Sequence, residues 1–171
     1  MAEYTTLPSE LHHLVPAGDG AHPAEQLDED LWVVAGKHAL ILIDSKQCSV
    51  VDSGLWHEVQ FARWQADTRK LTVVWAEPDH PGFSGITRTE DAARLMEAIT
   101  VRTERTILAT RSVYTPSGTR ISATVRRRPD GELFSVLVAD GPLSDKEVAR
   151  GEEIEATLRS ELGMGGSDLA K

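Results

Sequence analysis

The chain of 171 residues is long enough to bury a hydrophobic core, and it predicts one domain, with or without an appended lobe. Its formal net charge of −9 disfavours non-specific binding to nucleic acid or anionic lipid, because phosphate groups repel an acidic surface. Cys48 is the single cysteine, which excludes an intramolecular disulfide and a multi-cysteine zinc site within one chain. Its place in a strand-like run favours a buried, inert thiol.

No apolar stretch approaches the ~20 residues that a membrane-spanning helix needs. The N-terminus also lacks the basic segment and apolar stretch of a signal peptide. We therefore expect no transmembrane segment and a cytoplasmic protein. Residues 1–26 are mixed and polar, and several prolines and glycines interrupt them, which predicts a poorly ordered arm.

The next part of the chain is rich in β-branched and aromatic residues. Strands are predicted at residues 31–35, 38–44 and 47–51; the second is apolar on both faces and is expected to be central. The triplet 52–54 reads as a turn. Residues 57–65 and 70–76 then form the best hairpin in the chain.

Alternation within this hairpin predicts which side chains share a face of the sheet. Leu71, Val73 and Trp75 are expected on one face, and Trp64 on the other. Trp64 is therefore the tryptophan most suited to contact a partner, although tryptophans on strands more often belong to the core.

A short strand is predicted at residues 83–86, followed by a helix that a Thr87/Glu90 capping box begins and that ends near residue 103. Three strands follow at residues 107–114, 120–128 and 132–139, with one dry and one wet face. A second capping box, Ser144/Glu147, begins the last helix, which ends near residue 162.

This order of strands, helix, strands and helix predicts an α+β fold with antiparallel sheets. We divide the chain into an arm at 1–26, a first part at 27–105, a second part at 106–163 that packs on the same core, and a tail at 164–171.

Several motifs in the first part carry a resemblance. They are the paired strands LILID and CSVVD, the element Trp56-x-x-Val59, the hairpin end LTVVW and the helix after it. Over about residues 31–105 this pattern resembles the small bacterial pleckstrin-homology-like domains. The whole chain also resembles actinobacterial proteins of unknown function that share the hairpin motif ARW-x6-LTV.

The resemblance implies a strongly bent antiparallel sheet or partial barrel, capped by a helix, that binds lipid, peptide or protein and carries no catalytic residues. The basic loop that binds phosphoinositides is missing, because the first two turns hold only Lys37 and Lys46. The resemblance to pleckstrin-homology-like domains does not extend to residues 107–162.

Two groups of histidines and carboxylates are candidates for metal binding or proton transfer. The first is His57-Glu58 with the loop residues Glu77, Asp79 and His80, and the second is His12, His13 and His22. The first group lies at turns, where polar residues are common, and the second lies in the expected arm. We therefore predict no metal, no cofactor and no catalytic residue.

The cluster Arg126, Arg127 and Arg128 is the one basic run and is a candidate site for phosphate or an acidic partner. Alternation places Arg126 and Arg128 on the wet face and Arg127 on the apolar face, at a strand end. The alternative is a solvated strand end that balances nearby acids such as Glu132.

The sequence favours a non-enzymatic binding or interaction module with a protein partner, or a homodimer formed by edge-strand pairing. The first alternative is a small-molecule-binding protein or enzyme that uses a pocket between the two parts, with Arg63, His57 and Arg126 as its polar groups. The second alternative is nucleic-acid binding through Arg126–Arg128, which the acidic balance of the chain disfavours.

Overall fold

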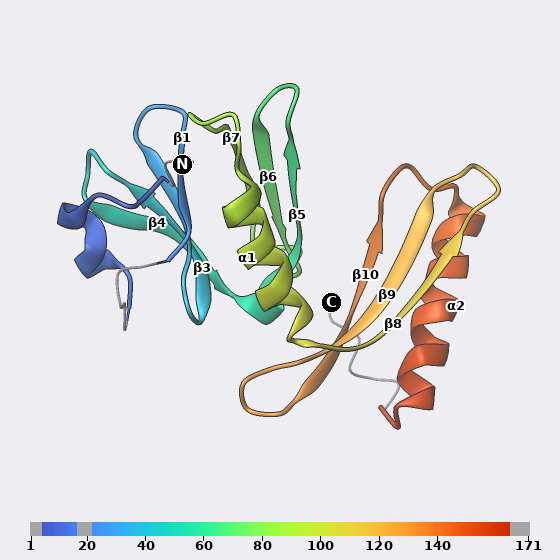
Figure 1. The fold of residues 1–171 in the computed structure, drawn as a ribbon. Coiled ribbons are helices and arrows are strands. Elements are labelled where there is room, and N and C mark those ends of the chain that lie inside the picture. The colour runs from blue at the N-terminus through green and yellow to red at the C-terminus, as the bar shows by residue number, and fades with distance from the viewer. Residues whose placement is uncertain (1–4, 17–21, 165–171) are drawn as a thin grey trace. The chain divides into compact units, whose positions relative to one another are not determined.

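The computed structural model describes residues 5–16 and 22–164 and divides the chain into two compact units, Met1–Thr103 and Glu104–Lys171 (Figure 1). The predicted α+β class is confirmed: the described residues form three antiparallel sheets together with α-helices and short 3-10 helices. No helix in the described part of the chain is long and apolar enough to cross a membrane.

The first sheet has four antiparallel strands in chain order: β1 (Ala24–Leu27), β2 (Leu31–Ala35), β3 (Ala39–Asp44) and β4 (Ser49–Leu55). The central position predicted for β3 is confirmed, since β2 and β4 pair with it on either side. Its apolar side chains alternate between two faces of the sheet, and both faces are buried.

The second sheet follows the short 3-10 helix η2 (Trp56–Glu58) and contains β5 (Val59–Gln65), β6 (Lys70–Trp75) and β7 (Phe83–Ile86). The predicted hairpin is the β5–β6 pair, although His57 lies in η2 and not in the strand.

The expected placement of Trp64 on the face opposite Leu71 is wrong. Trp64 is the register partner of Leu71, so both side chains are on the core-facing side. A register shift between Val59 and Phe61 accounts for the difference, because a bulge changes the face on which the following residues lie.

Main-chain hydrogen bonds connect the two sheets near the C-terminal ends of β1 and β7. The Asp28 N–H donates to the Ile86 carbonyl at 2.8 Å, and the Arg88 N–H donates to the Gln26 carbonyl at 3.0 Å. Within the described residues the sheets stay separate and do not close into a barrel.

The helix α1 (Ala93–Glu104) packs between the sheets through an apolar face, on which Leu95 and Ile99 are buried. It begins later than predicted, because Asp91 and not Thr87 caps it: Asp91 Oδ1 accepts from the Ala93 N–H at 2.9 Å. We call the cluster that α1 shares with both sheets the inner core: Leu27, Val33, Ala35, Leu40, Leu42, Trp56, Val59, Leu71, Val73, Trp75, Leu95 and Ile99.

The poorly ordered arm predicted at 1–26 is wrong for the described residues. Residues 9–14 form the 3-10 helix η1 (Ser9–Leu14), and β1 adds a strand to the first sheet. The expectation for residues 1–4 and 17–21 lies outside the described residues. We call the cluster on the other face of the first sheet the outer core: Leu7, Leu11, Val15, Ala24, Trp32, Val34, Ile41 and Ile43.

The strand predicted at 47–51 starts later and runs further, because Asp52, Ser53 and Gly54 continue β4 as partners of β3 and do not form a turn. Gly54 packs against Trp75, which explains a glycine inside a strand. Cys48 precedes the strand with φ 52° and is exposed, so the buried thiol that we predicted is wrong.

The second unit is a three-stranded antiparallel sheet in the order β10-β9-β8 with one helix. Its elements are β8 (Ile107–Tyr114), β9 (Arg120–Arg127), β10 (Leu133–Ala139) and α2 (Asp145–Glu161), close to the predicted ranges. This unit has a hydrophobic core of its own, formed by Ala123, Val125, Ile154 and Leu158.

The capping box predicted at the start of α2 is confirmed, since Ser144 Oγ accepts from the Glu147 N–H at 3.2 Å. One other expectation is wrong: the face of β9 that was expected to be wet includes the buried Thr124 and Arg126. Of the expected tail, Met164 packs against the core of the second unit, and residues 165–171 lie outside the described residues.

Candidate functional site

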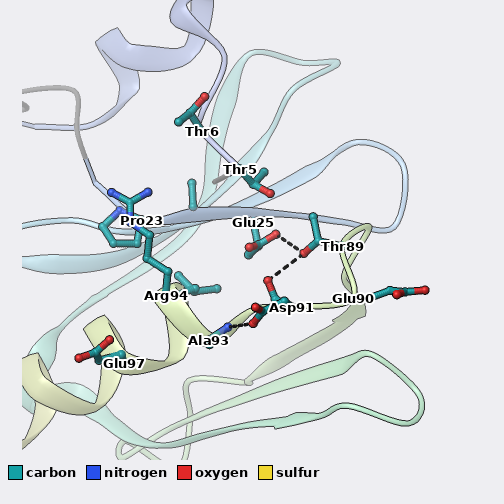
Figure 2. A pocket seen from close by; sticks show the side chains of 12 residues that line it. Thr5, Thr6, Pro23, Glu25, Thr89, Glu90, Asp91, Ala93, Arg94 and Glu97 are labelled. Atoms are coloured by element: carbon teal, nitrogen blue, oxygen red, sulfur yellow. Dashed lines mark hydrogen bonds between the residues drawn. The ribbon is translucent and has the colours of Figure 1, made fainter. Parts of the chain in front are cut away.

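A pocket of about 870 Å³ opens in the first unit between β1, the N-terminal segment and the start of α1. Figure 2 shows its walls: Thr5 and Thr6 on one side, β1 with Pro23 and Glu25 behind, and the 89–91 loop with the first turns of α1 on the other side. A volume of this order is typical of small-ligand sites in proteins.

Glu25 is the buried acid of this pocket. Its side chain is largely removed from solvent, with the residue only 5% exposed. Glu25 Oε2 accepts a hydrogen bond from the Thr89 hydroxyl at 2.8 Å, and the Thr5 side chain also lines the pocket. Burial raises the pKa of the Glu25 carboxyl above its usual value, because the charged form has lost much of its hydration.

The position of Glu25 follows from the alternation of β1. Glu25 is the register partner of Val33, and Val33 belongs to the inner core. Because side chains of paired residues are on the same face of a sheet, Glu25 is on the inner face, at its margin beside α1. The same alternation places Ala24 in the outer core.

The start of α1 supplies further carboxylates to the pocket. Asp91 caps the helix, and Glu90 and Glu97 also line the wall, whereas Arg94 is the one basic residue there. The described lining thus holds four carboxylates, counting Glu25, against one guanidinium. Such a surface attracts a positively charged group and repels an anion.

None of the six predicted site residues lines this pocket. His57 is buried in η2, with its Nε2 4.0 Å from Glu58 Oε1. Arg63 is exposed on β5, with its guanidinium 5.7 Å from the ring of Phe61. Trp64 is half-buried against the inner core, and its Nε1 donates to Thr87 Oγ1 at 3.2 Å.

The three arginines of the second unit have different environments. Arg126 is 2% exposed, its Nε donates to Thr124 Oγ1 at 3.3 Å, and burial lowers its pKa to about 10. Arg127 is exposed at the strand end. Arg128 is 4.4 Å from the ring centre of Phe134 and 3.4 Å from Glu132 Oε1. Only Arg127 is thus both exposed and without such a contact.

The loop candidate His80 has a partner that the sequence did not suggest. Its Nε2 is 2.6 Å from Asp52 Oδ1, and its ring stacks on Trp75 with centres 4.6 Å apart. Trp75 Nε1 donates to the other oxygen of Asp52 at 3.0 Å. This arrangement fixes the loop after β6 to β4, which is a structural role.

The described residues contain no group of three or more histidine, cysteine, aspartate or glutamate side chains that could hold a metal ion. Of the histidines near the N-terminus, His12 and His13 lie in η1, where His12 Nε2 is 2.8 Å from the Leu7 carbonyl. His22 lies outside that helix, just before β1.

Glu25, Thr89 and Asp91 are not among the site residues predicted from the sequence. The available signal was the i, i+2 relation of Glu25 to Leu27, which places a carboxylate on the apolar face of a strand. That signal was hidden because the strand lies within the segment that composition predicted to be an arm.

Comparison of the chain with protein-family models, curated proteins and solved structures finds no match.

Proposed function

We propose that the chain is a non-enzymatic binding module whose first unit is a pleckstrin-homology-like domain. The support is the element order of that unit: four antiparallel strands, three antiparallel strands, then a helix packed between the two sheets. The sequence motifs from LILID to LTVVW carry the same resemblance. A cytoplasmic location is part of this proposal.

The working site of the module is the Glu25 pocket, and its ligand is a positively charged group. One observation carries this: Glu25, a residue only 5% exposed, lines a pocket with three other carboxylates and one arginine. The ionised form of Glu25 is disfavoured by burial, so a cation that enters the pocket supplies the missing charge compensation. The ammonium or guanidinium group of a basic peptide segment has this chemistry.

This choice is preferred to nucleic-acid binding through Arg126–Arg128. A phosphate-binding surface needs several exposed cations. Arg126 is buried, and Arg128 already contacts Glu132 and Phe134. The basic run therefore offers Arg127 as its one exposed cation without such a contact among the described residues.

Homodimerisation through the open edge of β4 is also less favourable than the sequence suggested. Two N–H groups of β4 are occupied by side chains: Ser53 N–H donates to Asp52 Oδ1 at 2.9 Å, and Leu55 N–H donates to Glu58 Oε2 at 2.7 Å. An added strand would have to displace both carboxylates, which is a known way of protecting sheet edges.

Isothermal titration calorimetry of the full chain with a lysine-rich peptide and with spermidine tests the proposal. We expect the unaltered chain to bind at least one of these cations and not inorganic phosphate. Glu25→Gln should weaken cation binding at least ~tenfold, because it removes the buried charge that the ligand pairs with.

The matched control is Glu10→Gln, which removes the same charge from an exposed residue of η1 that does not line the pocket. Its affinity should stay within about twofold of the unaltered chain. Equal losses in both variants would mean that the cations respond to net charge alone and would refute the site.

A further inference from the structure

The N-terminal segment, residues 5–16, is attached to the first sheet by apolar side chains. Leu7, Leu11 and Val15, at i, i+4 and i+8, insert into the outer core and are 7%, 2% and 8% exposed. They cover a face of β2 and β3 that is apolar in its own right, formed by Trp32, Val34, Ile41 and Ile43.

Main-chain hydrogen bonds play no part in this attachment among the described residues. The N–H groups of Leu11 and Val15 donate within the segment, to the carbonyls of Pro8 at 2.9 Å and His12 at 3.1 Å. The polar contact that joins the segment to the first sheet within the described residues is made by side chains: His13 Nε2 lies 3.9 Å from Cys48 Sγ. Removing the segment would therefore leave every strand pairing of the sheet intact.

The same segment completes the candidate site. Thr5 and Thr6 form the wall of the pocket that faces α1, and they are joined to η1 by only two residues, Leu7 and Pro8 (Figure 2). Leu7 is also the first apolar anchor. Docking of the three anchors thus positions the pocket wall.

We propose that residues 5–16 are a detachable strap that closes the Glu25 pocket when it docks on the outer core and opens it when it is released. The strap is held by apolar packing and is separable from the strand pairing, so it undocks without unfolding of the sheet. Its effect on ligand binding rests on the proposed function, whereas its detachment does not.

Amide hydrogen exchange of the full chain, followed by NMR, tests detachment directly. Leu11→Asp places a charge in the outer core, and Ser9→Asp places the same charge on an exposed position of the strap. In Leu11→Asp we expect the amides of Leu11 and Val15 to exchange at least ~tenfold faster, with β2 and β3 changed less than about twofold. Ser9→Asp should change neither set.

Equal loss of protection in the strap and in β2 and β3 would overturn the proposal, since the segment would then be part of the cooperative core. Unchanged strap exchange in Leu11→Asp would overturn it as well. If Leu11→Asp does not fold, the exchange of the strap and of β2 and β3 is compared in Leu11→Ala, which is a milder change. Equal loss of protection in both regions, or unchanged exchange of the strap, would overturn the proposal there as well.

Spermidine binding separates this proposal from the proposed function. If the unaltered chain binds and Leu11→Asp weakens binding at least ~fivefold, the strap closes the site, because loss of a pocket wall lowers affinity. If the unaltered chain binds and Leu11→Asp binds equally well, the strap does not close the site. If the unaltered chain does not bind, the proposed function fails, and the exchange data alone decide whether the strap detaches.

Discussion

Trp75 Nε1 donates a hydrogen bond to Asp52 Oδ2 at 3.0 Å, and this bond joins the two sheets of the first unit. Asp52 belongs to β4 and Trp75 to β6. Because Asp52 also binds His80 and Trp75 stacks on the same imidazole, three side chains from two sheets and one loop form one network. The network fixes how the sheets meet on the side away from the β1–β7 contact.

Asp52→Ala should destabilise the first unit by ~2–4 kcal/mol, because it leaves the buried indole N–H of Trp75 without its acceptor and releases His80. Chemical denaturation followed by tryptophan fluorescence measures this loss. Asp79→Ala is the control, since Asp79 is exposed in the same loop. A change in Asp52→Ala as small as in Asp79→Ala would mean that the network contributes nothing.

Gly54→Ala should be among the most damaging single-methyl additions in the chain. A Cβ at position 54 would overlap Cζ3 of Trp75, and the indole is buried in the inner core. We expect a loss of ~2–3 kcal/mol or more from overpacking, together with an altered near-ultraviolet circular dichroism signal of tryptophan. Thermal unfolding supplies the measurement, and a melting temperature equal to that of the unaltered chain would show that Trp75 can move aside.

The carboxyl of Glu25 should make stability depend on pH in a defined direction. Since burial raises its folded-state pKa, its contribution is complete below the unfolded pKa and is lost as pH rises through the folded value. Glu25→Gln removes this loss, so the variant should gain stability relative to the unaltered chain between about pH 4 and about pH 7. Denaturation at both pH values tests this, and a relative loss of stability over that interval would contradict it.

The carboxyl of Glu147 should make the stability of the second unit depend on pH in the opposite direction. Hydrogen bonds from the Thr115 side chain, the Ser144 N–H and the Ser117 hydroxyl lower its pKa to about 2 from an ordinary value of 4.5. Its stabilising contribution is therefore present above the unfolded pKa and is lost as pH falls through the folded one.

Glu147→Gln should abolish that part of the acid sensitivity of the second unit between about pH 4.5 and about pH 2. Urea denaturation across this interval measures the effect, with exposed Glu152→Gln as the matched control. Identical pH profiles for Glu147→Gln and the unaltered chain would show that the contacts do not favour the ionised carboxylate.

Much of the fold could be predicted because local signals agreed with the tertiary structure. The alternation of Leu71, Val73 and Trp75, the hairpins of the second unit and the Ser144/Glu147 capping box all lie in short segments whose pattern decides their structure. The predictions from the sequence were wrong where a contact with a distant residue overrides the local pattern. Gly54 reads as a turn residue, yet it is a strand residue because Trp75 occupies the space of its missing side chain.

The candidate site could not be predicted because its residues come from three separate segments. Thr5, Glu25 and Thr89 are brought together only when β1 pairs with β2 and the 89–91 loop folds against it. The strap was not predicted either: Pro8 and several polar residues interrupt the series Leu7, Leu11 and Val15, so their common face appears only with η1 docked.

The central claim, that a positively charged group binds in the Glu25 pocket, is tested most directly by mapping where a cation binds. We would titrate the isotope-labelled full chain with spermidine and follow the backbone amides by NMR. The account predicts saturable shifts concentrated at Glu25, Thr89 to Asp91 and the first turn of α1, and their absence in Glu25→Gln. Shifts spread over exposed acids elsewhere, or unchanged in Glu25→Gln, would contradict it.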